Sequence, residues 1–376
     1  MKLSRLIVFI AFLMLICNLA YSDPFELSGK SKTDFRSANM YAGQKIFEKA
    51  LPLYLSVLKE NPDHIESLER VAGIYFDIKK DYFTANEYYQ KAIDSIESAL
   101  AQYEELKKSD PAAAKKFYKK RIKKLKLEDK LESMKKFKKS CWIHIFKEAK
   151  NKFDNKSYDE AIEELNKLLE IAPDSIKTIK LIAYSYREKG DDENTLKFLQ
   201  MAYGVDSTDV NVIDMIAAIY FDKKEYEKAA EWYKKESVLE PQNPDIYFNI
   251  GSCYFNLRDD ENALQAYAKV VELDSTNIDA AINAYNFANR LKKDNEAINY
   301  LKIAVNNDPE NKDNLSILCY KLFQLKKYDD VIVYAEKWFA LDNSSKEAAQ
   351  LIYQAARMLG KKELENKYAD ILKNMQ

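Results

Sequence analysis

The chain has 376 residues, of which 47% are hydrophobic and 32% are charged, enough apolar material for a continuous core beneath a solvated surface. It contains only 7 glycines and 8 prolines, which excludes a fold rich in strands, tight hairpins and long loops. The formal net charge is −1, so any strongly charged surface must come from local segregation of the two signs.

The N-terminal segment has the pattern of a bacterial-type secretory signal peptide. Lys2 and Arg5 precede an apolar run over residues 6–17, and the small residues before Asp23 fit cleavage after Ser22. Lipid attachment at Cys17 is one alternative, although the residues before it are large. An uncleaved anchor is another, although the run is shorter than the ~20 residues that span a bilayer. We expect a signal peptide over 1–22, a short linker over 23–30, and export to the periplasm or cell envelope.

Residues 31–98 have apolar spacings of three and four, which is the helical period. We expect two helix pairs here, forming an N-terminal block. Their second helices share a pattern of small and aromatic residues, carried by Ala50, Tyr54 and Val57 and by Ala85, Tyr89 and Ala92.

The segment 99–141 combines helical spacing with strong positive charge. Asp110-Pro111 forces a break, and between Lys115 and Lys139 there are 13 basic against 3 acidic residues, a difference of +10. Because apolar residues persist at helical spacing, the segment is predicted to be ordered. It is interpreted as a long basic helical hairpin between two blocks, or as one degenerate copy of the repeat described next.

From about Trp142 to the C-terminus one unit repeats every 34 residues. The repeat is clearest in one column of small residues: Ala161, Thr195, Ala229, Ala263, Ala297 and Val331. Each copy is interpreted as a helix, a tight turn, a second helix and a stop. The stop residues are Pro173, Ser207, Pro241, Ser275, Pro309 and Asn343. A period of this length predicts an array of two-helix units.

At these residues the chain resembles the tetratricopeptide repeat (TPR) family. The copy with Ala217, Tyr220, Ala229, Tyr233 and Pro241 matches well. The resemblance covers about 142–374 and resumes in 31–98. It implies an all-α solenoid, a right-handed superhelix of antiparallel helix pairs, with a C-terminal array over 142–376 that ends in a capping helix. It also implies a non-catalytic scaffold for protein or peptide partners.

In that family the first helix of each pair faces the concave side, so the resemblance implies a binding groove lined by aromatic rings. The candidate groove residues are Phe153, Tyr184, Phe221, Phe248, Phe255, Tyr320 and Phe323. The alternative is that these rings pack on neighbouring helices. The family's clamp for C-terminal carboxylates is not expected, because Tyr184, Met215 and Asp245 stand where it requires polar or basic groups.

The basic segment predicts a surface made by Lys119, Lys120, Arg121, Lys123, Lys124 and Lys126. Anionic lipid or another envelope surface would suit it, which gives a second hypothesis, a peripheral tether. Docking on this protein's own acidic repeats and an acidic protein partner are the alternatives. A nucleic-acid role is not expected, because no recognition motif accompanies the charge.

No enzymatic chemistry, cofactor or metal is expected. The two histidines, His64 and His144, lie far apart and outside any metal or acid–base pattern, and there is no glycine-rich phosphate loop. After cleavage three cysteines remain, Cys141, Cys253 and Cys319. We interpret them as small core residues, with a reactive thiol at Cys141 as the alternative.

Overall fold

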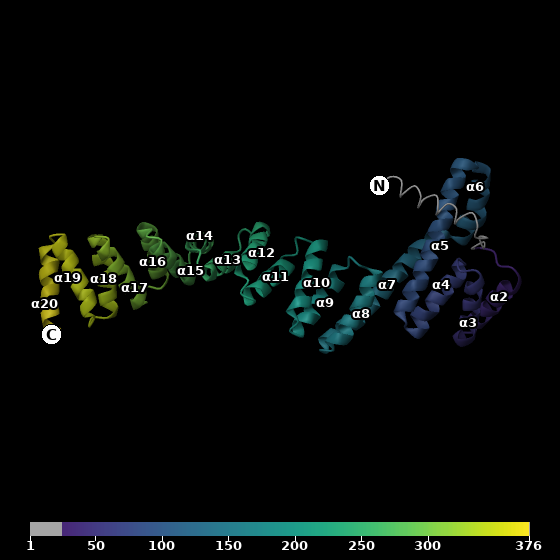
Figure 1. Ribbon diagram of the computed structural model, residues 1–376, viewed down its shortest axis with the longest axis horizontal. Helices are drawn as coiled ribbons and strands as arrows, with labels where there is room; N and C mark the ends of the chain where they lie inside the picture. Colours follow the sequence, from purple (N-terminus) through teal and green to yellow (C-terminus); the bar gives the residue numbers. More distant parts are fainter. Residues whose placement is uncertain (1–24, 376) are drawn as a thin grey trace. The chain divides into compact units, whose positions relative to one another are not determined.

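The computed structural model describes residues 25–375, and all of the regular structure in that range is helical (Figure 1). The all-α fold class is therefore confirmed. The predicted signal segment, with Cys17, lies outside the described residues. Within the described part of the chain, no helix combines the length and apolarity needed to cross a bilayer.

The chain forms two compact units, which we call unit 1 (residues 1–185) and unit 2 (residues 186–376). The predicted boundary between Cys141 and Trp142 is not marked by any break, because it falls inside one continuous helix, α7.

Unit 1 contains helix pairs and two short π-helical segments, η1 and η2. Its elements are α2 (Gly29–Gly43), α3 (Phe47–Glu60), α4 (Ile65–Ile74), η1 (Tyr75–Lys79), α5 (Tyr82–Ser109), α6 (Pro111–Phe117), η2 (Tyr118–Lys123), α7 (Leu127–Asp154) and α8 (Tyr158–Ile171). The helix α9 (Ile176–Glu188) begins in unit 1 and ends in unit 2. In the pairs of unit 1, α2 packs on α3, α4 on α5, and α7 on α8.

The basic segment is a hairpin, as one of the two interpretations predicted, but it is not a separate insertion. Helices α5 and α7 have 28 residues each and pack along one another, whereas the ordinary second helices α3 and α8 have 14. The hairpin is thus made by lengthening two helices of flanking pairs. The predicted break occurs where Asp110 Oδ1 accepts hydrogen bonds from the backbone N–H groups of Ala112 and Ala113. Pro111 occupies the first helical position, where its missing N–H costs nothing.

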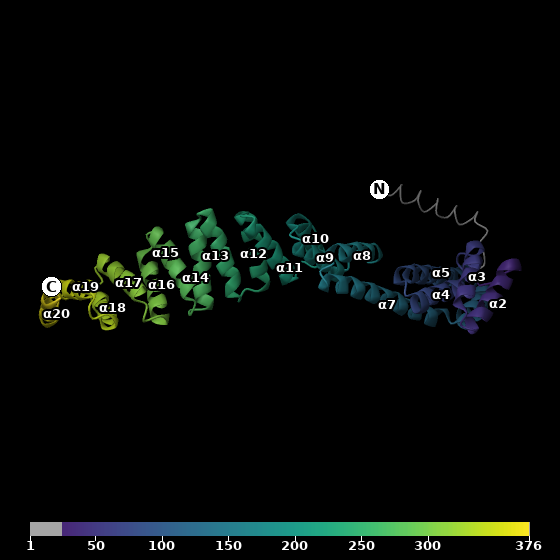
Figure 2. The same ribbon diagram turned by 90° about the horizontal axis from the view of Figure 1, so that it is seen from below.

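Unit 2 is an α-solenoid in which each helix from α10 onward packs on the next one in the chain (Figure 2). Its first helices after α9 are α11 (Val210–Asp222), α13 (Pro244–Leu257), α15 (Ile278–Arg290), α17 (Lys312–Gln324) and α19 (Lys346–Met358). Its second helices are α10 (Asp192–Val205), α12 (Tyr226–Leu239), α14 (Asp260–Leu273), α16 (Asp294–Asn307), α18 (Tyr328–Leu341) and α20 (Lys362–Asn374). The second helices begin 34 residues apart throughout, as the sequence period predicts.

The column of small residues is fully buried. All six of its members have no exposed surface: Ala161, Thr195, Ala229, Ala263, Ala297 and Val331. Small side chains at this place allow two helix axes to approach closely, and the close approach excludes water from the seam.

From the pair of α7 and α8 onward, each turn between a first and a second helix contains one residue in the left-handed conformation. These residues are also 34 apart: Lys156, Gly190, Lys224, Arg258, Lys292, Lys326 and Gly360. In the turn after α11, Lys224 has a φ of 60°, and the following N–H, that of Glu225, donates to the carbonyl of Tyr220 at 2.8 Å. This bond satisfies a carbonyl at the helix end that would otherwise lack a partner.

Candidate binding surfaces

Three rings of the predicted groove are engaged in packing. In Phe153, Phe221 and Phe323 the ring is half-buried and lies edge to face against the tyrosine that begins the second helix of the same pair. The centroid distances to these tyrosines are 5.5 Å for Tyr158, 5.3 Å for Tyr226 and 5.4 Å for Tyr328. This corrects their assignment to an exposed row, because the rings close the turn within each pair.

Two further rings are also half-buried. Phe248 lies 5.3 Å from the buried ring of Tyr267, so it belongs to the core of unit 2. Tyr184 lies on α9, and its side chain is half-buried as well.

The remaining two rings are exposed, as a groove would require. Phe255 on α13 is 56% exposed and Tyr320 on α17 is 50% exposed. Phe255 differs from the turn-packing phenylalanines because the next second helix begins with Asp260, which provides no ring to pack against. Its nearest aromatic neighbour is Phe287 at 6.0 Å.

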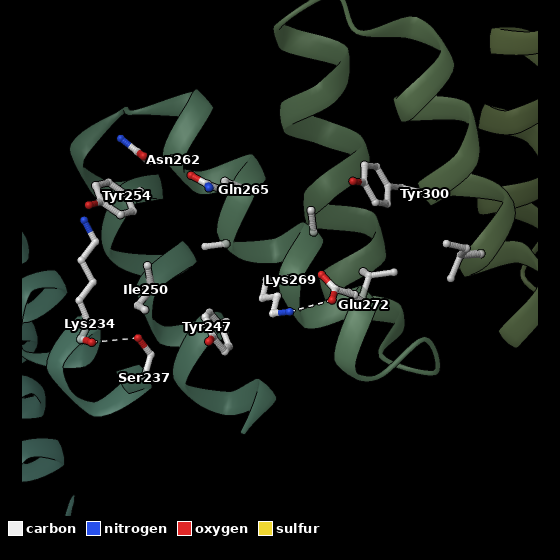
Figure 3. Close-up of a pocket in the computed structure, with 14 residues that line it drawn as sticks. Lys234, Ser237, Tyr247, Ile250, Tyr254, Asn262, Gln265, Lys269, Glu272 and Tyr300 are labelled. Atoms are coloured by element: carbon white, nitrogen blue, oxygen red, sulfur yellow. Dashed lines mark hydrogen bonds and ion pairs between the residues drawn. The ribbon is translucent and has the colours of Figure 1, made fainter. Parts of the chain in front are cut away.

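Unit 2 also has a hollow between the first helix α13 and the second helices α12, α14 and α16. None of the groove residues predicted from the sequence lines it. We call it the Ala266 hollow; it has a volume of about 840 Å³, within the usual range of ligand sites (Figure 3). It is lined by Lys234 and Ser237 of α12, Tyr247, Ile250 and Tyr254 of α13, Asn262, Gln265, Ala266, Ala268, Lys269, Val271 and Glu272 of α14, and Tyr300 and Ile303 of α16.

Three tyrosine rings and two lysine ammonium groups contribute to the wall of the hollow. The Lys234 ammonium lies 5.1 Å from the centre of the Tyr254 ring, and Lys269 forms an ion pair with Glu272 at 2.7 Å. Tyr247 donates a hydrogen bond to the carbonyl of Pro241, and burial raises the pKa of Tyr300. Apolar rings beside a few oriented polar groups suit the binding of an amphipathic side chain.

Unit 1 has its own hollow of about 640 Å³, with a more polar wall. Its lining includes Asn39, which accepts a hydrogen bond from the Tyr54 hydroxyl at 2.6 Å, and Glu69, which pairs with Lys130. Some of the polar groups of this hollow are thus paired within unit 1.

The basic segment divides into a paired part and an exposed part. Lys130 and Lys135 form ion pairs with Glu69 and Glu97, which is the docking on the protein's own acidic residues considered above. Arg121 is half-buried, with its guanidinium 4.7 Å from the Phe25 ring, so it is removed from the predicted surface. Between Lys115 and Lys126 the exposed lysines are Lys115, Lys116, Lys119, Lys120, Lys123, Lys124 and Lys126, and Lys135, Lys136 and Lys139 are exposed further along the segment, on α7.

The seven exposed lysines between Lys115 and Lys126 have no carboxylate at ion-pair distance among residues 25–375. In α6 and η2 the side chains of Ala114 and Ile122 are buried, so the lysines of those elements occupy the opposite, solvated side. The result is a concentrated positive face on the hairpin.

The histidines and cysteines occupy structural positions. His64 is buried at the start of α4, where its Nδ1 accepts a hydrogen bond from the Ser67 N–H at 3.3 Å. His144 is exposed and stacks on Tyr82 at 4.3 Å. Cys141, Cys253 and Cys319 are fully buried thiols, and burial raises the pKa of each to about 12, which contradicts a reactive thiol at Cys141.

The acidic pairs at the turns act as helix starts. Asp191 and Asp259 each accept a hydrogen bond from a backbone N–H in the first turn of the second helix. In the described part of the chain no group of three or more His, Cys, Asp or Glu side chains is arranged to hold a metal ion.

Glu236 on α12 is a buried polar side chain that was not predicted from the sequence. It occupies a column otherwise held by apolar residues such as Ala202 and Val270, and it is 5% exposed. Its Oε2 has no hydrogen-bond partner, and burial, with the nearby Asp214 and Glu240, raises the pKa of the carboxyl to about 7. A glutamate in an apolar column was the signal that could have identified it.

Two family models match parts of the chain. A model described as a TPR repeat matches residues 217–258, and one described as a tetratricopeptide repeat matches 147–175 and 244–277. The last of these stretches contains one helix pair, α13 with α14. No curated protein is similar enough in sequence to match.

Several solved structures are similar to parts of the chain at low identity. The C-terminal part of a TPR repeat-containing protein from Cytophaga hutchinsonii is 18% identical, covering 61% of this chain and 95% of that one, with a TM-score of 0.39. YrrB, described as a TPR protein with an unusual peptide-binding site, is 17% identical over 50% of this chain and 96% of its own, with a TM-score of 0.38. PilF of Pseudomonas aeruginosa is 16% identical over 56% and 95%, with a TM-score of 0.34.

Proposed function

Because this chain is a tetratricopeptide-repeat protein, we propose that it is a non-catalytic scaffold that binds a segment of a partner protein on the first helices of unit 2. We further propose, from the pattern of residues 1–22, that it works in the periplasm or cell envelope of a bacterium. The observation that carries the binding surface is the exposure of Phe255 and Tyr320, two large rings on first helices that leave half or more of their surface to water.

The first helix between these two rings supplies polar groups. On α15, Asn286 and Asn289 are exposed; the amide of Asn286 can both donate and accept a hydrogen bond, and the amide of Asn289, whose Oδ1 accepts a hydrogen bond from Lys321 at 2.6 Å, keeps its N–H groups for a peptide. An extended peptide needs such groups along its backbone and apolar contacts for its side chains. The surface therefore suits a peptide that places apolar side chains on Phe255 and Tyr320.

Site-specific crosslinking in cells tests this surface. A photoreactive amino acid at Phe255 or at Tyr320 should give the same discrete adduct with one partner. Val238, 79% exposed on the second helix α12, is the matched control and should give no such adduct. An equal adduct from all three positions, or none from the first two, would contradict the proposal. Detection of a mature N-terminus after Ser22 in an envelope fraction would test the location separately.

A second candidate function, a peripheral tether, is favoured by the seven unpaired lysines of the hairpin. Each lysine close to an anionic membrane contributes roughly 1 kcal/mol of attraction, and salt screens this contribution. Reversal of Lys119, Lys120, Lys123 and Lys124 to glutamate should weaken sedimentation with anionic vesicles at least about 100-fold.

The matched control for the tether reverses the same number of lysines in the last helix pair: Lys361, Lys362, Lys367 and Lys373. This variant changes the net charge equally and should leave vesicle binding nearly unchanged. Absence of binding by the wild-type chain at low salt would exclude the tether.

A further inference from the structure

Neighbouring second helices of unit 2 are related by one repeated pair of positions. At the Ala266 hollow both positions of this pair hold small residues, and the space that larger side chains would fill is left open. In the two pairs that are in ring contact, a residue near the end of one second helix packs on a residue in the middle of the next. The 34-residue period fixes the five pairs: Tyr203 with Trp232, Ser237 with Ala266, Val271 with Tyr300, Val305 with Tyr334, and Phe339 with Tyr368.

Two of these pairs show how the position is filled by the chain itself. Tyr203 and Trp232 pack edge to face at 4.9 Å, and Phe339 and Tyr368 do so at 5.6 Å. In four of the five pairs the residue on the later helix is a tryptophan or a tyrosine. The exception is Ala266, and its partner position holds Ser237, the smallest residue in its own column.

The absence of a large side chain at both positions accounts for the hollow. Ser237 and Ala266 both line it, and Ala266 is only 5% exposed, so the space lies above a buried methyl group. Tyr254 and Tyr300 stand at its sides, and Figure 3 shows them on either side of Gln265.

A lysine is already placed for an aromatic ring in this space. Lys235 comes three residues after Trp232, and its ammonium lies 3.7 Å from the centre of a ring of that tryptophan. Lys337 has the same relation to Tyr334, at 5.0 Å. Lys269 comes three residues after Ala266, where there is no ring, and it pairs instead with Glu272.

We propose that the Ala266 hollow binds an aromatic side chain presented by a partner protein. The incoming ring takes the place that Trp232 and its equivalents fill elsewhere, between the tyrosine rings and beneath the Lys269 ammonium. A buried aromatic anchor of this kind is typical of binding hot spots. Lys234, which has no carboxylate at ion-pair distance in the described part of the chain, favours an acidic residue beside the ring.

The test is a fluorine NMR titration of the full chain with a short glycine- and serine-rich peptide that carries one 5-fluorotryptophan between two aspartates. The wild-type chain should shift and broaden the fluorine signal. A peptide with alanine in place of tryptophan should not compete, and flanking lysines in place of the aspartates should weaken binding.

Filling the hollow provides the decisive variant. Ser237→Tyr combined with Ala266→Trp recreates the Tyr203 and Trp232 pair and should weaken peptide binding at least 10-fold. Val238→Trp, which adds a ring at an exposed site on the same helix, should leave binding unchanged. Lys269→Met should weaken it by about 3-fold, whereas Lys235→Met, beside a ring that is already in place, should not.

Binding that persists in the filled variant would overturn the proposal. If that variant does not fold, Ser237→Cys in the full chain replaces it, since Ser237 lines the hollow and is only half-buried, whereas the thiols native to the described residues are fully buried. The peptide should then protect the introduced thiol from alkylation, and no protection would overturn the proposal.

If the wild-type chain is a dimer and the filled variant is a monomer, the hollow belongs to a second copy of the chain. That result would also overturn the proposal. Phe255→Ala and Tyr320→Ala should leave peptide binding unchanged. The proposal for the Ala266 hollow and the proposal for the first-helix surface are therefore tested independently.

Discussion

The ring of Tyr267 lies directly against the backbone of Gly251. A Cβ atom at Gly251 would stand 2.9 Å from two carbons of that ring, closer than real carbon contacts. Tyr267 is 4% exposed and helps to hold α14 against α13, so the constraint on Gly251 comes from lack of space beside this ring and not from backbone freedom.

Gly251→Ala should therefore push the Tyr267 ring out of place and lower the free energy of unfolding by about 1–3 kcal/mol. Combining it with Tyr267→Leu should recover part of the loss, because the chain already uses a buried alanine and a buried leucine at the equivalent positions, Ala149 and Leu165. Urea unfolding of the single and double variants measures the coupling. Additive losses would show that the two residues do not interact.

The left-handed turn residues make a second prediction. Lys224 has a φ of 60°, where its Cβ atom is sterically strained. Gly190, at the equivalent position, has a φ of 75° and no Cβ atom, so it is free of this strain. Lys224→Gly should raise the free energy of unfolding by up to about 1 kcal/mol, and Gly190→Lys should lower it by a similar amount. A Cβ at Gly190 would meet nothing within 4 Å, so the second change tests the backbone alone. Midpoints of urea unfolding that move in the same direction for both variants would contradict this account.

The pKa of His64 predicts a pH dependence of unit 1. Burial and, second to it, the nearby Lys130 lower the pKa of His64 from 6.5 to about 4. The unfolded chain therefore binds the proton more readily than the folded one, so this stability is present above about pH 6.5 and is lost as the pH falls toward 4. The loss should reach roughly 3 kcal/mol.

Hydrogen exchange at α4 between pH 4 and pH 7 measures this loss. His64→Asn keeps an acceptor for the Ser67 N–H and removes the titrating group, so it should flatten the pH profile. An unchanged profile would assign the dependence to other groups.

Glu236 predicts the opposite trend in unit 2. Its raised pKa, about 7, means that the folded chain holds the proton more tightly than the unfolded chain. Stability from this group is complete below about pH 4.5 and is lost as the pH rises through 7. Glu236→Gln should therefore stabilise α12 at pH 8, by as much as roughly 3 kcal/mol. The exposed Glu231→Gln on the same helix is the control for the change in net charge, and hydrogen exchange at α12 is the measurement.

The 34-residue period was sufficient to predict the helices of unit 2, their stops and the buried column from Ala161 to Val331. These features depend on the local helical spacing and on one small residue at each helix crossing, and both are visible along the chain. The break at Asp110-Pro111 was predictable from local sequence too, since aspartate favours the cap position and proline favours the first position of a helix.

The surfaces could not be predicted in this way. Whether a phenylalanine of the aromatic row is buried depends on the first residue of the next helix, so Phe221 packs on Tyr226 while Phe255, followed by Asp260, is exposed. Arg121 carries the same charge as its lysine neighbours. Its guanidinium nevertheless packs over the ring of Phe25, nearly a hundred residues away in the chain.

The sequence by itself thus determined the helices, their pairing and the class of protein, because each depends on spacings within a single repeat. The tertiary structure alone decided which side chains meet water and where space is left. The Ala266 hollow exists because two small residues 29 positions apart face each other across neighbouring helices, and only the packing of α12 against the next repeat brings Ser237 and Ala266 to the same wall.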